Sequence, residues 1–219
     1  MPLTLFAHPF SSYCQKVLIA LYENGTPFTW ALLDQDHPDV SAEFERLWPL
    51  KRMPLLLDDG RPVAEASIII EHLALHHPGP VRLIPEDATA ALEVRFLDRF
   101  FDNYVMTEMN RPVAETLRGP DGRRETALQE AAVALDKAYA WLEPRLQGRT
   151  WAAGEAFTLA DCAAAPSLFY ADWVRPIGED FPAVRAYRAR LLARPSVARC
   201  IEEARPYRSY FPLGAPDRD

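Results

Sequence analysis

Residues 53–73 read "MPLLLDDGRPVAEASIIIEHL", and this stretch gives the strongest indication of the fold class. The segment "PLLLDDGRPVA" at 54–64 predicts a β-hairpin, because the Asp-Asp-Gly sequence at 58–60 is a typical turn between two short strands. The segment at 65–77 is typical of a helix, which the Pro-Gly-Pro sequence at 78–80 ends. The stretch therefore predicts two antiparallel strands followed by a helix.

The residues on the N-terminal side of this stretch alternate between strand and helix patterns. The sequence "LTLFA" at 3–7 predicts a strand, and "SYCQKVLIALYEN" at 12–24 predicts a helix that ends at Gly25. The sequence "PFTWALL" at 27–33 predicts a second strand, and the polar segment at 34–41 predicts a loop or a short helix. This order of strands and helices is that of a small α/β domain.

Only helical patterns follow the stretch, because the alternation typical of strands disappears from Pro85 onward. Thr158 and Asp161 match a capping box, which predicts the start of a helix. We expect helices at 93–105, 126–146, 158–174 and 181–204, with a break at 119–122. The sequence thus predicts an α/β domain at 1–78 and an all-α domain at 86–219.

The composition indicates a soluble globular protein. Hydrophobic residues make up 49% of the 219 residues, and no apolar run approaches the roughly 18 to 20 residues of a membrane span. The formal net charge of -7 argues against a nucleic-acid partner. The opening "MPLTLFAHPF" lacks a basic segment and a cleavage site, so we expect no signal peptide and a cytoplasmic protein. The three cysteines match no zinc pattern, so we expect neither a metal site nor a structural disulfide.

Three short motifs combine residue types that can bind a charged ligand. The Ser-Ser-Tyr-Cys sequence at 11–14 lies between the first strand and the first helix, where free amides and the helix dipole favour an anion such as a thiolate. The Glu-Ala-Ser sequence at 65–67 begins another helix, where amides can hold a carboxylate and Glu65 can hold an ammonium group. A cis Met53–Pro54 bond would offer the Met53 backbone to a ligand. Each motif also has a structural explanation, because serine and acidic residues commonly begin helices and proline commonly begins strands.

In this order and at these distances, the motifs at 11–14, 53–56, 65–73 and 157–161 resemble those of the glutathione transferase superfamily. The resemblance covers essentially the whole chain. It implies a thioredoxin-like N-terminal domain and an all-helical C-terminal domain, in agreement with the patterns described above. It also implies that the Met53–Pro54 bond is cis and that the protein forms a homodimer.

The resemblance implies a glutathione site in the first domain. The backbone of Met53 would bind the cysteinyl part of glutathione, Glu65 would hold its γ-glutamyl end and Arg52 would meet its glycine carboxylate. Many members have a serine where this chain has Ala66, so one expected hydroxyl is missing, and Ser67 offers a hydroxyl one position later. The glutathione-binding residues implied by the resemblance are Arg52, Met53, Pro54, Glu65, Ala66 and Ser67.

Ser11 falls where the serine-type members, which are theta- and zeta-like, keep the serine that activates the thiol of glutathione. A free thiol has a pKa of about 8.5, so a hydroxyl group and a helix N-terminus would stabilise its thiolate at neutral pH. Ser12 and Tyr13 are alternative activators, and the catalytic assignment is Ser11 with Ser12 in reserve. His8 stands near the place where other members keep an activating tyrosine, and we expect it to be structural.

The implied function is that of a glutathione transferase, which adds its co-substrate glutathione to a small hydrophobic electrophile without a metal. We expect no nucleic-acid partner and no membrane partner. The electrophile pocket should be apolar and lie between the two domains. Its candidate residues are Phe10, Phe101, Tyr104, Val105 and Tyr210, with Tyr207 and Phe211 in the same aromatic tail.

Other functions remain open at this point. Cys14 could form mixed disulfides with glutathione, although "SSYC" at 11–14 lacks the leading cysteine that is the nucleophile of C-x-x-C redox motifs. A non-catalytic binding protein could keep the same fold, because a fold does not imply an activity. A zeta-like isomerase ranks lower, because the residues after the serine pair differ from those usual in that class.

Overall fold

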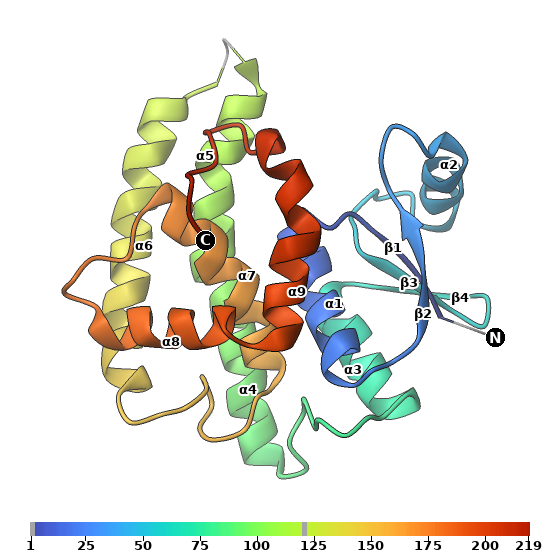
Figure 1. Cartoon of the computed structure of the whole chain (residues 1–219), viewed down its shortest axis with the longest axis horizontal. Helices are drawn as coiled ribbons and strands as arrows, with labels where there is room; N and C mark the ends of the chain where they lie inside the picture. The colour runs from blue at the N-terminus through green and yellow to red at the C-terminus, as the bar shows by residue number, and fades with distance from the viewer. Residues whose placement is uncertain (1–2, 120–121) are drawn as a thin grey trace.

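The computed structural model describes residues 3–119 and 122–219. Its N-terminal part contains four strands, β1 (Leu3–Ala7), β2 (Phe28–Leu32), β3 (Leu55–Asp58) and β4 (Arg61–Ala64) (Figure 1). They form one mixed sheet with the order β2-β1-β3-β4. β1 pairs in parallel with β2 and antiparallel with β3, and β3 forms the predicted hairpin with β4.

Three helices, α1 (Ser12–Glu23), α2 (Pro38–Leu47) and α3 (Ala66–His76), pack on this sheet. α1 and α3 lie on one face and α2 lies on the other (Figure 1). Side chains of β1 alternate between the two faces: Leu5 joins the core around α1, while Phe6 stacks on Phe44 of α2 with ring centroids 6.2 Å apart. The polar segment at 34–41, predicted as a loop or a short helix, leads into the longer helix α2, which Pro38 begins.

The hairpin turn and the end of α1 have the backbone geometry that the sequence predicts. Asp59 and Gly60 both have positive φ, 47° and 80°, as the central residues of type I′ hairpin turns do. Gly25 has φ 56° beyond the last turn of α1; its amide donates to the Tyr22 carbonyl, and the Thr26 amide donates to the Leu21 carbonyl. These bonds form the Schellman motif that commonly ends a helix at glycine.

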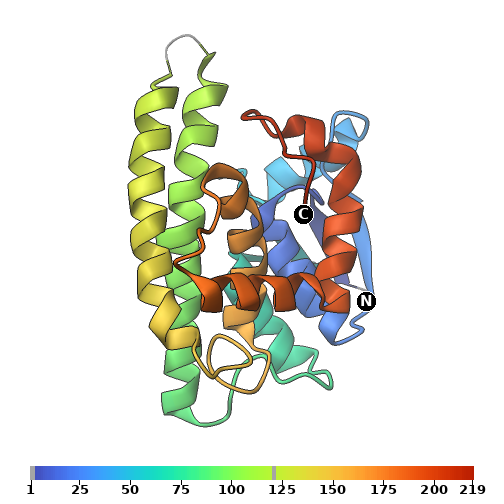
Figure 2. The same cartoon turned by 60° about the vertical axis from the view of Figure 1, so that its left-hand side comes forward.

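The C-terminal part is all helical, which confirms the predicted combination of an α/β part and an all-α part. Its elements are α4 (Ala88–Phe100), η1 (Phe101–Met106), α5 (Thr107–Leu117), α6 (Arg124–Leu146), α7 (Leu159–Val174), α8 (Pro182–Leu192), α9 (Pro195–Ala204) and η3 (Arg205–Tyr210). α5 and α6 run side by side as a long pair, and α8 lies across α6 (Figure 2). The break predicted at 119–122 falls between α5 and α6, although residues 120 and 121 lie outside the described residues. The helix predicted at 181–204 is divided in two, because Pro195 lacks an amide hydrogen and begins α9.

One long helical run takes the place of the helix predicted at 93–105. α4, the π-helical turn η1 and α5 follow one another from Ala88 to Leu117. A π turn holds one residue more than an α turn, so the side chains beyond it face directions that a period of 3.6 residues does not predict. This change of direction affects the candidate site, because Asp102 and Asn103 lie in η1.

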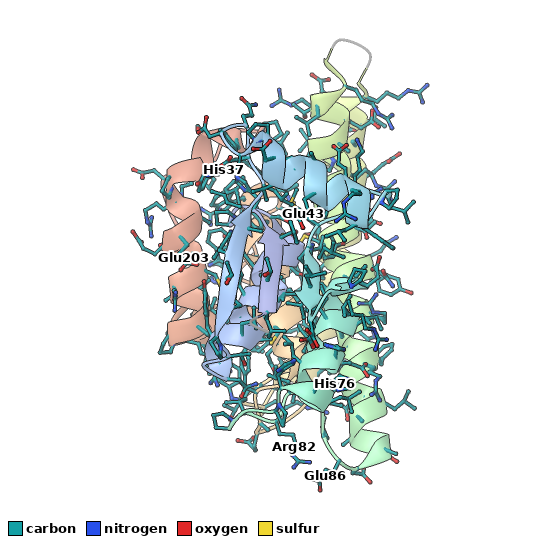
Figure 3. The ribbon with its side chains drawn as sticks, turned by 90° about the vertical axis from the view of Figure 1, so that its right-hand side faces the viewer. His37, Glu43, His76, Arg82, Glu86 and Glu203 are labelled. Carbon is teal, nitrogen blue, oxygen red and sulfur yellow. The ribbon has the colours of Figure 1, made fainter. Side chains whose placement is uncertain are left out.

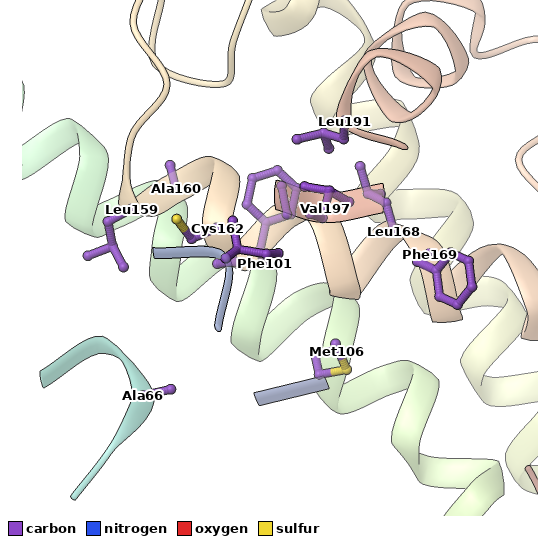
Figure 4. Close-up of a cluster of buried hydrophobic side chains, with 14 of the residues drawn as sticks. Ala66, Phe101, Met106, Leu159, Ala160, Cys162, Leu168, Phe169, Leu191 and Val197 are labelled. Atoms are coloured by element: carbon purple, nitrogen blue, oxygen red, sulfur yellow. The ribbon is translucent and has the colours of Figure 1, made fainter. Parts of the chain in front are cut away.

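α7 forms the centre of the helical part. All residues from Leu159 to Asp172 are buried, and the predicted capping box is present at Thr158 and Asp161. α1 packs against α7 and α9, so one apolar core continues from the sheet into the helical part. Figure 4 shows a cluster of this core in the helical part, including Phe101, Leu168 and Val197. Within residues 3–119 and 122–219, no helix combines the length and the apolar character needed to cross a bilayer.

Candidate functional site

A polar pocket of about 590 Å³ lies where the first part of the chain meets α4 and η1. Segments that are far apart in the sequence converge on it. The predicted residues that line it are Ser11, Arg52, Met53, Pro54, Glu65, Ala66 and Ser67. Tyr13, Lys51, Arg99, Asp102 and Asn103 complete the lining.

The N-terminus of α3 forms one wall of the polar pocket. Glu65 precedes this helix with φ 71°, a left-handed backbone conformation that residues other than glycine rarely adopt. Such residues concentrate at ligand sites, where the surrounding structure holds them in place. The exposed side chain of Glu65 and the free amides of the first turn, which starts at Ala66, therefore offer a carboxylate and an anion site next to each other.

The segment before β3 adds basic side chains to the lining of the polar pocket. Lys51 and Arg52 both line the pocket, and Lys51 Nζ lies 2.6 Å from a carboxylate oxygen of Glu45. Arg52 is exposed and makes no ion pair with any carboxylate of the described residues. The Met53–Pro54 peptide bond that follows is cis, as the resemblance implied. The lining of the pocket thus combines the positive charge of Arg52 with the carboxylate of Glu65.

A buried ion cluster lies beneath Ser67 and joins the two parts of the chain. Lys16 of α1 is only 1% exposed, and its Nζ lies 2.5 Å from Asp98 Oδ1 and 2.8 Å from Asp102 Oδ2. Lys16 also donates to Ser67 Oγ at 2.9 Å, and Ser67 in turn donates to Asp98 Oδ2 at 2.8 Å. The hydroxyl of Ser67 is therefore committed to this Lys16 cluster, and its backbone amide remains for a ligand.

Arg99 completes the Lys16 cluster at the surface of the polar pocket. Its guanidinium lies 2.8 Å from Asp98 Oδ2 and 2.5 Å from Asp102 Oδ2, and about half of its side chain is exposed. Burial raises the pKa of Asp102, while the positive charge of Lys16 opposes this rise. Two cations face two carboxylates in the cluster, so it adds little net charge to the pocket wall.

Ser11 is the N-cap of α1 and lines both the polar pocket and a second, apolar pocket. Its Oγ accepts a hydrogen bond from the Cys14 amide at 3.4 Å. Because this bond uses an oxygen lone pair, the hydroxyl hydrogen can still be donated to a ligand. Tyr13 also lines both pockets, but burial raises its pKa, so the phenol stays protonated at neutral pH. Ser12 lines the apolar pocket and not the polar one.

The apolar pocket has a volume of about 260 Å³ and lies between the residues around Ser11 and the helical part. Of the residues predicted for the electrophile pocket, Phe10, Tyr210 and Phe211 line it. The prediction omitted its other apolar residues, which are Met109, Val113, Leu117, Tyr170 and Pro212. Met109, Val113 and Leu117 were omitted because the predicted helix at 93–105 ended before α5 begins, whereas Tyr170 lies on α7 and reaches the pocket through tertiary packing.

The structure places Phe101, Tyr104 and Val105 outside this apolar pocket, which corrects the sequence prediction. Phe101 and Val105 are 0% exposed and belong to the core that η1 forms with α7. Tyr104 is 59% exposed and does not line the pocket. All three lie in η1, whose extra residue changes the direction of the following side chains, so Met109 and Val113 of α5 reach the pocket instead.

Contacts on two sides hold the loop that carries Ser11. His8 Nδ1 accepts the Phe10 amide at 3.1 Å, and the His8 ring packs edge-on against Tyr207 with centroids 4.6 Å apart. Tyr170 of α7 donates its hydroxyl to the Phe10 carbonyl at 2.9 Å and accepts from Gln15 Nε2 at 3.1 Å. These contacts give His8 and Tyr207 a structural role, and the helical part thereby positions the N-terminus of α1.

Cys14 is fully buried, and burial raises the pKa of its thiol to about 11. The side chain of Ser11 and the backbone of His8 oppose this rise only in part. A thiol that is buried and protonated does not act as a nucleophile at neutral pH. The structure therefore argues against a thiol–disulfide function through Cys14.

Lys16, Asp98 and Asp102 were not among the predicted site residues, although each leaves a signal in the sequence. Lys16 lies in a helix whose neighbouring positions are apolar, and buried lysines are rarely found without a partner. Asp98 and Asp102 are four residues apart in a segment rich in phenylalanine, which places both carboxylates on one helix face. A lysine in one apolar segment and two aspartates in another are the sequence pattern expected of a buried ion cluster.

Comparisons with known proteins agree with this architecture. The glutathione S-transferase N-terminal domain family matches residues 5–81, and the glutathione S-transferase C-terminal domain family matches residues 105–195. Glutathione S-transferase-like protein LUC7 of a Fusarium species is 30% identical over 71% of this chain and 71% of its own, and FtsZ-localized protein A of Caulobacter vibrioides is 28% identical over 88% of this chain and 87% of its own. A solved glutathione S-transferase of Methylobacterium radiotolerans in complex with glutathione sulfonate is 29% identical, with a TM-score of 0.77 over 92% of this chain and 95% of its own. By its sheet, its helical part and these matches, the chain belongs to the glutathione S-transferase superfamily.

Proposed function

We propose that this protein is a glutathione transferase, which binds reduced glutathione in the polar pocket and adds it to an electrophile held in the apolar pocket. One observation carries the proposal: Ser11, at the N-terminus of α1, lines both pockets. A hydroxyl at this junction can stabilise a sulfur anion from the polar side while the electrophile approaches from the apolar side. The relative solved with glutathione sulfonate supports the choice of co-substrate.

The polar pocket offers a counterpart to each polar group of glutathione. Glu65 suits the ammonium group, and the amides at Ala66 and Ser67 suit the γ-glutamyl carboxylate. Arg52, which also lines the pocket, suits the glycine carboxylate. The backbone beside the cis bond at Met53 suits the cysteinyl part. The ligand would thus lie with its thiol toward Ser11.

The proposed reaction is a nucleophilic attack by the glutathione thiolate. The thiol proton passes to solvent, and the Ser11 hydroxyl and the amides at the start of α1 stabilise the sulfur anion that remains. The sulfur electron pair forms the new bond to carbon, and the leaving group departs with the electron pair of the bond that breaks. Tyr13 and Ser12 are the alternative hydroxyl donors.

The electrophile is proposed to be small and aromatic. The apolar pocket is only about 260 Å³ in volume, and its lining includes the rings of Phe10, Tyr170, Tyr210 and Phe211. Phe10 and Tyr170 form an edge-on pair with centroids 5.5 Å apart, and Tyr170 stacks on Phe211 at 6.4 Å. Rings arranged in this way favour an aryl group, which can pack against their faces and edges.

Two measurements test the proposal. Titration calorimetry with reduced glutathione at neutral pH tests binding, and the rate of conjugation to an activated aryl halide tests the reaction. We expect Ser11→Ala to lower kcat by at least about tenfold and to leave glutathione affinity nearly unchanged, because the hydroxyl acts on the developing thiolate. Ser41→Ala, on α2 and outside both pockets, is the control with an equal loss of one hydroxyl. Equal turnover in Ser11→Ala and the wild type would refute the role of Ser11. A loss of turnover confined to Ser12→Ala or Tyr13→Phe would assign the stabilisation of the thiolate to the residue replaced.

A non-catalytic binding protein is the second candidate, and a specific observation favours it. Position 66 is alanine, and the hydroxyl of Ser67 is committed to Lys16 and Asp98. The γ-glutamyl carboxylate would therefore meet backbone amides and no side-chain hydroxyl, which predicts weak binding. One relative bears the name FtsZ-localized protein A. Failure of glutathione to bind at millimolar concentration, checked by a second method, would favour this candidate over the transferase.

We also propose that the protein is a cytoplasmic homodimer. Arg95 of α4 donates to Glu71 of α3 at 2.7 Å, so these two helices lie next to each other (Figure 3). Large apolar side chains on them are more than half exposed, namely Ile68, Leu75, Leu92 and Phe96. An apolar face of this kind, termed the α3–α4 face below, commonly marks a protein interface.

The proposed cytoplasmic location rests on the cysteines. The buried free cysteines fit a reducing compartment.

A further inference from the structure

Two histidines and an aspartate meet on the N-terminal part of the chain, away from both pockets. Asp58 ends β3, His72 lies on α3 and His77 directly follows that helix. The Nε2 atoms of His72 and His77 each lie 2.8 Å from Asp58 Oδ2. The three ligand atoms all lie within 4.8 Å of one another. His72 and His77 follow Asp58 by 14 and 19 positions in the sequence, and the fold brings their two nitrogens and its oxygen together.

The donor atoms of this Asp58 cluster match a zinc site in type and in spacing. Zinc prefers tetrahedral coordination by histidine nitrogens and carboxylate oxygens at about 2.0–2.2 Å, which places neighbouring ligand atoms roughly 3.3 Å apart. The 2.8 Å separation between each nitrogen and the oxygen requires only a small outward movement of the side chains to admit the ion. A metal would replace the two imidazole N–H hydrogens that converge on the same oxygen.

The surroundings of the Asp58 cluster would allow a cation to bind between the three side chains. Within residues 3–119 and 122–219, no lysine or arginine forms an ion pair with Asp58. The side chains that contact its carboxylate there are His72 and His77. The side chains of Asp58, His72 and His77 are 16%, 11% and 32% exposed, so solvent and ions can reach them. His76, labelled in Figure 3, adds a third imidazole nearby, with its ring centroid 4.5 Å from that of His72.

We propose that Asp58, His72 and His77 form a zinc site, with the fourth coordination position open to water. A bound ion would join the β3–β4 hairpin to the C-terminal end of α3, whose other end presents Glu65 to the polar pocket. The sequence predicted no metal site because its three cysteines match no zinc pattern, and the proposed site contains no cysteine. The site is independent of the proposed transferase activity.

Metal titration of the full-length chain without a histidine tag tests this site. The protein is first freed of metal with a chelator and then titrated with zinc chloride at neutral pH by calorimetry. We expect saturable binding of one zinc ion per chain, a higher Tm with zinc, and tetrahedral absorption bands when cobalt(II) replaces zinc. Magnesium chloride should produce none of these effects, because imidazole ligands do not suit magnesium.

Variants decide whether the three named residues bind the metal. Asp58→Asn and His77→Gln should each weaken zinc binding by at least about tenfold. His37→Gln is the matched control, because His37 also pairs with an aspartate, with 2.6 Å between its Nδ1 and Asp34 Oδ1, and belongs to no part of the proposed site. The zinc affinity of this variant should equal that of the wild type. Circular dichroism verifies that each variant is folded, and His77 is exposed enough for its replacement to be tolerated. Absence of stoichiometric binding in the wild type, or unchanged affinity in both Asp58→Asn and His77→Gln, would show that the proposal is wrong.

Discussion

At the scale of single residues, Lys16 links the candidate site to the rest of the molecule. Its ammonium group contacts Asp98 of α4, Asp102 of η1 and Ser67 of α3, so one side chain connects three elements to α1. Removal of charges from water is costly unless every charge is paired, and each member of the cluster therefore depends on the others. The same cluster explains why the hydroxyl of Ser67 cannot replace the one missing at Ala66.

Replacement of Lys16 by methionine should lower the free energy of unfolding by about 3–5 kcal/mol, because it leaves buried carboxylates without their main partner. Urea unfolding followed by circular dichroism measures this loss. Lys51→Met is the matched control: the side chains of Lys51 and Glu45 are 59% and 48% exposed, and we expect a loss of less than about 1 kcal/mol. Similar losses in the two variants would show that the Lys16 cluster is not a buried, interdependent unit.

At the scale of secondary-structure elements, the start of α7 is held by one carboxylate. Asp161 is 0% exposed; its Oδ2 accepts the Thr158 amide at 2.8 Å, and its Oδ1 accepts the Ala152 amide at 2.9 Å and the Tyr187 hydroxyl at 2.6 Å. The capping box is therefore more than a local helix start, because the same side chain also fixes the preceding loop and α8. This position matters for the site, since α7 carries Tyr170.

Asp161→Ala should lower the free energy of unfolding by at least about 3 kcal/mol, because it leaves several buried donors without an acceptor. Asp87→Ala is a suitable comparison: Asp87 is the exposed N-cap of α4, its Oδ1 accepts the Ala90 amide at 2.8 Å, and its loss should cost about 1 kcal/mol. Both values can be obtained from chemical denaturation. An equal cost for the two variants would reduce Asp161 to an ordinary helix cap.

At the scale of the whole molecule, α1 packs on one side against the sheet and on the other against α7 and α9. Hydrogen bonds also connect the two parts; for example, the Tyr22 hydroxyl donates to Glu203 Oε2 at 2.8 Å. The division into domains at 1–78 and 86–219 stays a prediction, and the two pockets depend on both parts. The α3–α4 face remains uncovered in the single chain.

The proposed homodimer can be tested on the α3–α4 face. The double variant Ile68→Glu/Leu92→Glu, with residues 54% and 67% exposed, should convert a dimer into a monomer, because association would bury two negative charges on each copy. Light scattering coupled to size-exclusion chromatography measures the mass. Val133→Glu on α6, where the valine is 56% exposed, should leave the mass unchanged. A wild-type protein of monomer mass, or a double variant that stays dimeric, would contradict the prediction.

Short-range patterns in the sequence determined much of the fold. The turn at 58–60, the end of α1 at Gly25 and the capping box at 158–161 were all predictable, because residues near one another in the chain set the backbone geometry there. The resemblance added many of the residues that line the polar pocket, from Ser11 to Ser67, since its motifs keep a fixed order along the chain. These features depend little on which distant segments pack together.

Only the tertiary structure decided the features that need distant partners. Lys16 and Asp102 are 86 positions apart, and Gln15 and Tyr170 are 155 apart, so no local pattern predicts either contact. The π turn η1 changed the direction of the side chains beyond it, which moved the apolar pocket from Phe101 and Val105 to α5. The burial of Cys14 and the meeting of Asp58 with His72 and His77 likewise arise from packing between elements. The physical reason is the same in each case: burial and long-range charge pairing are properties of the folded chain as a whole.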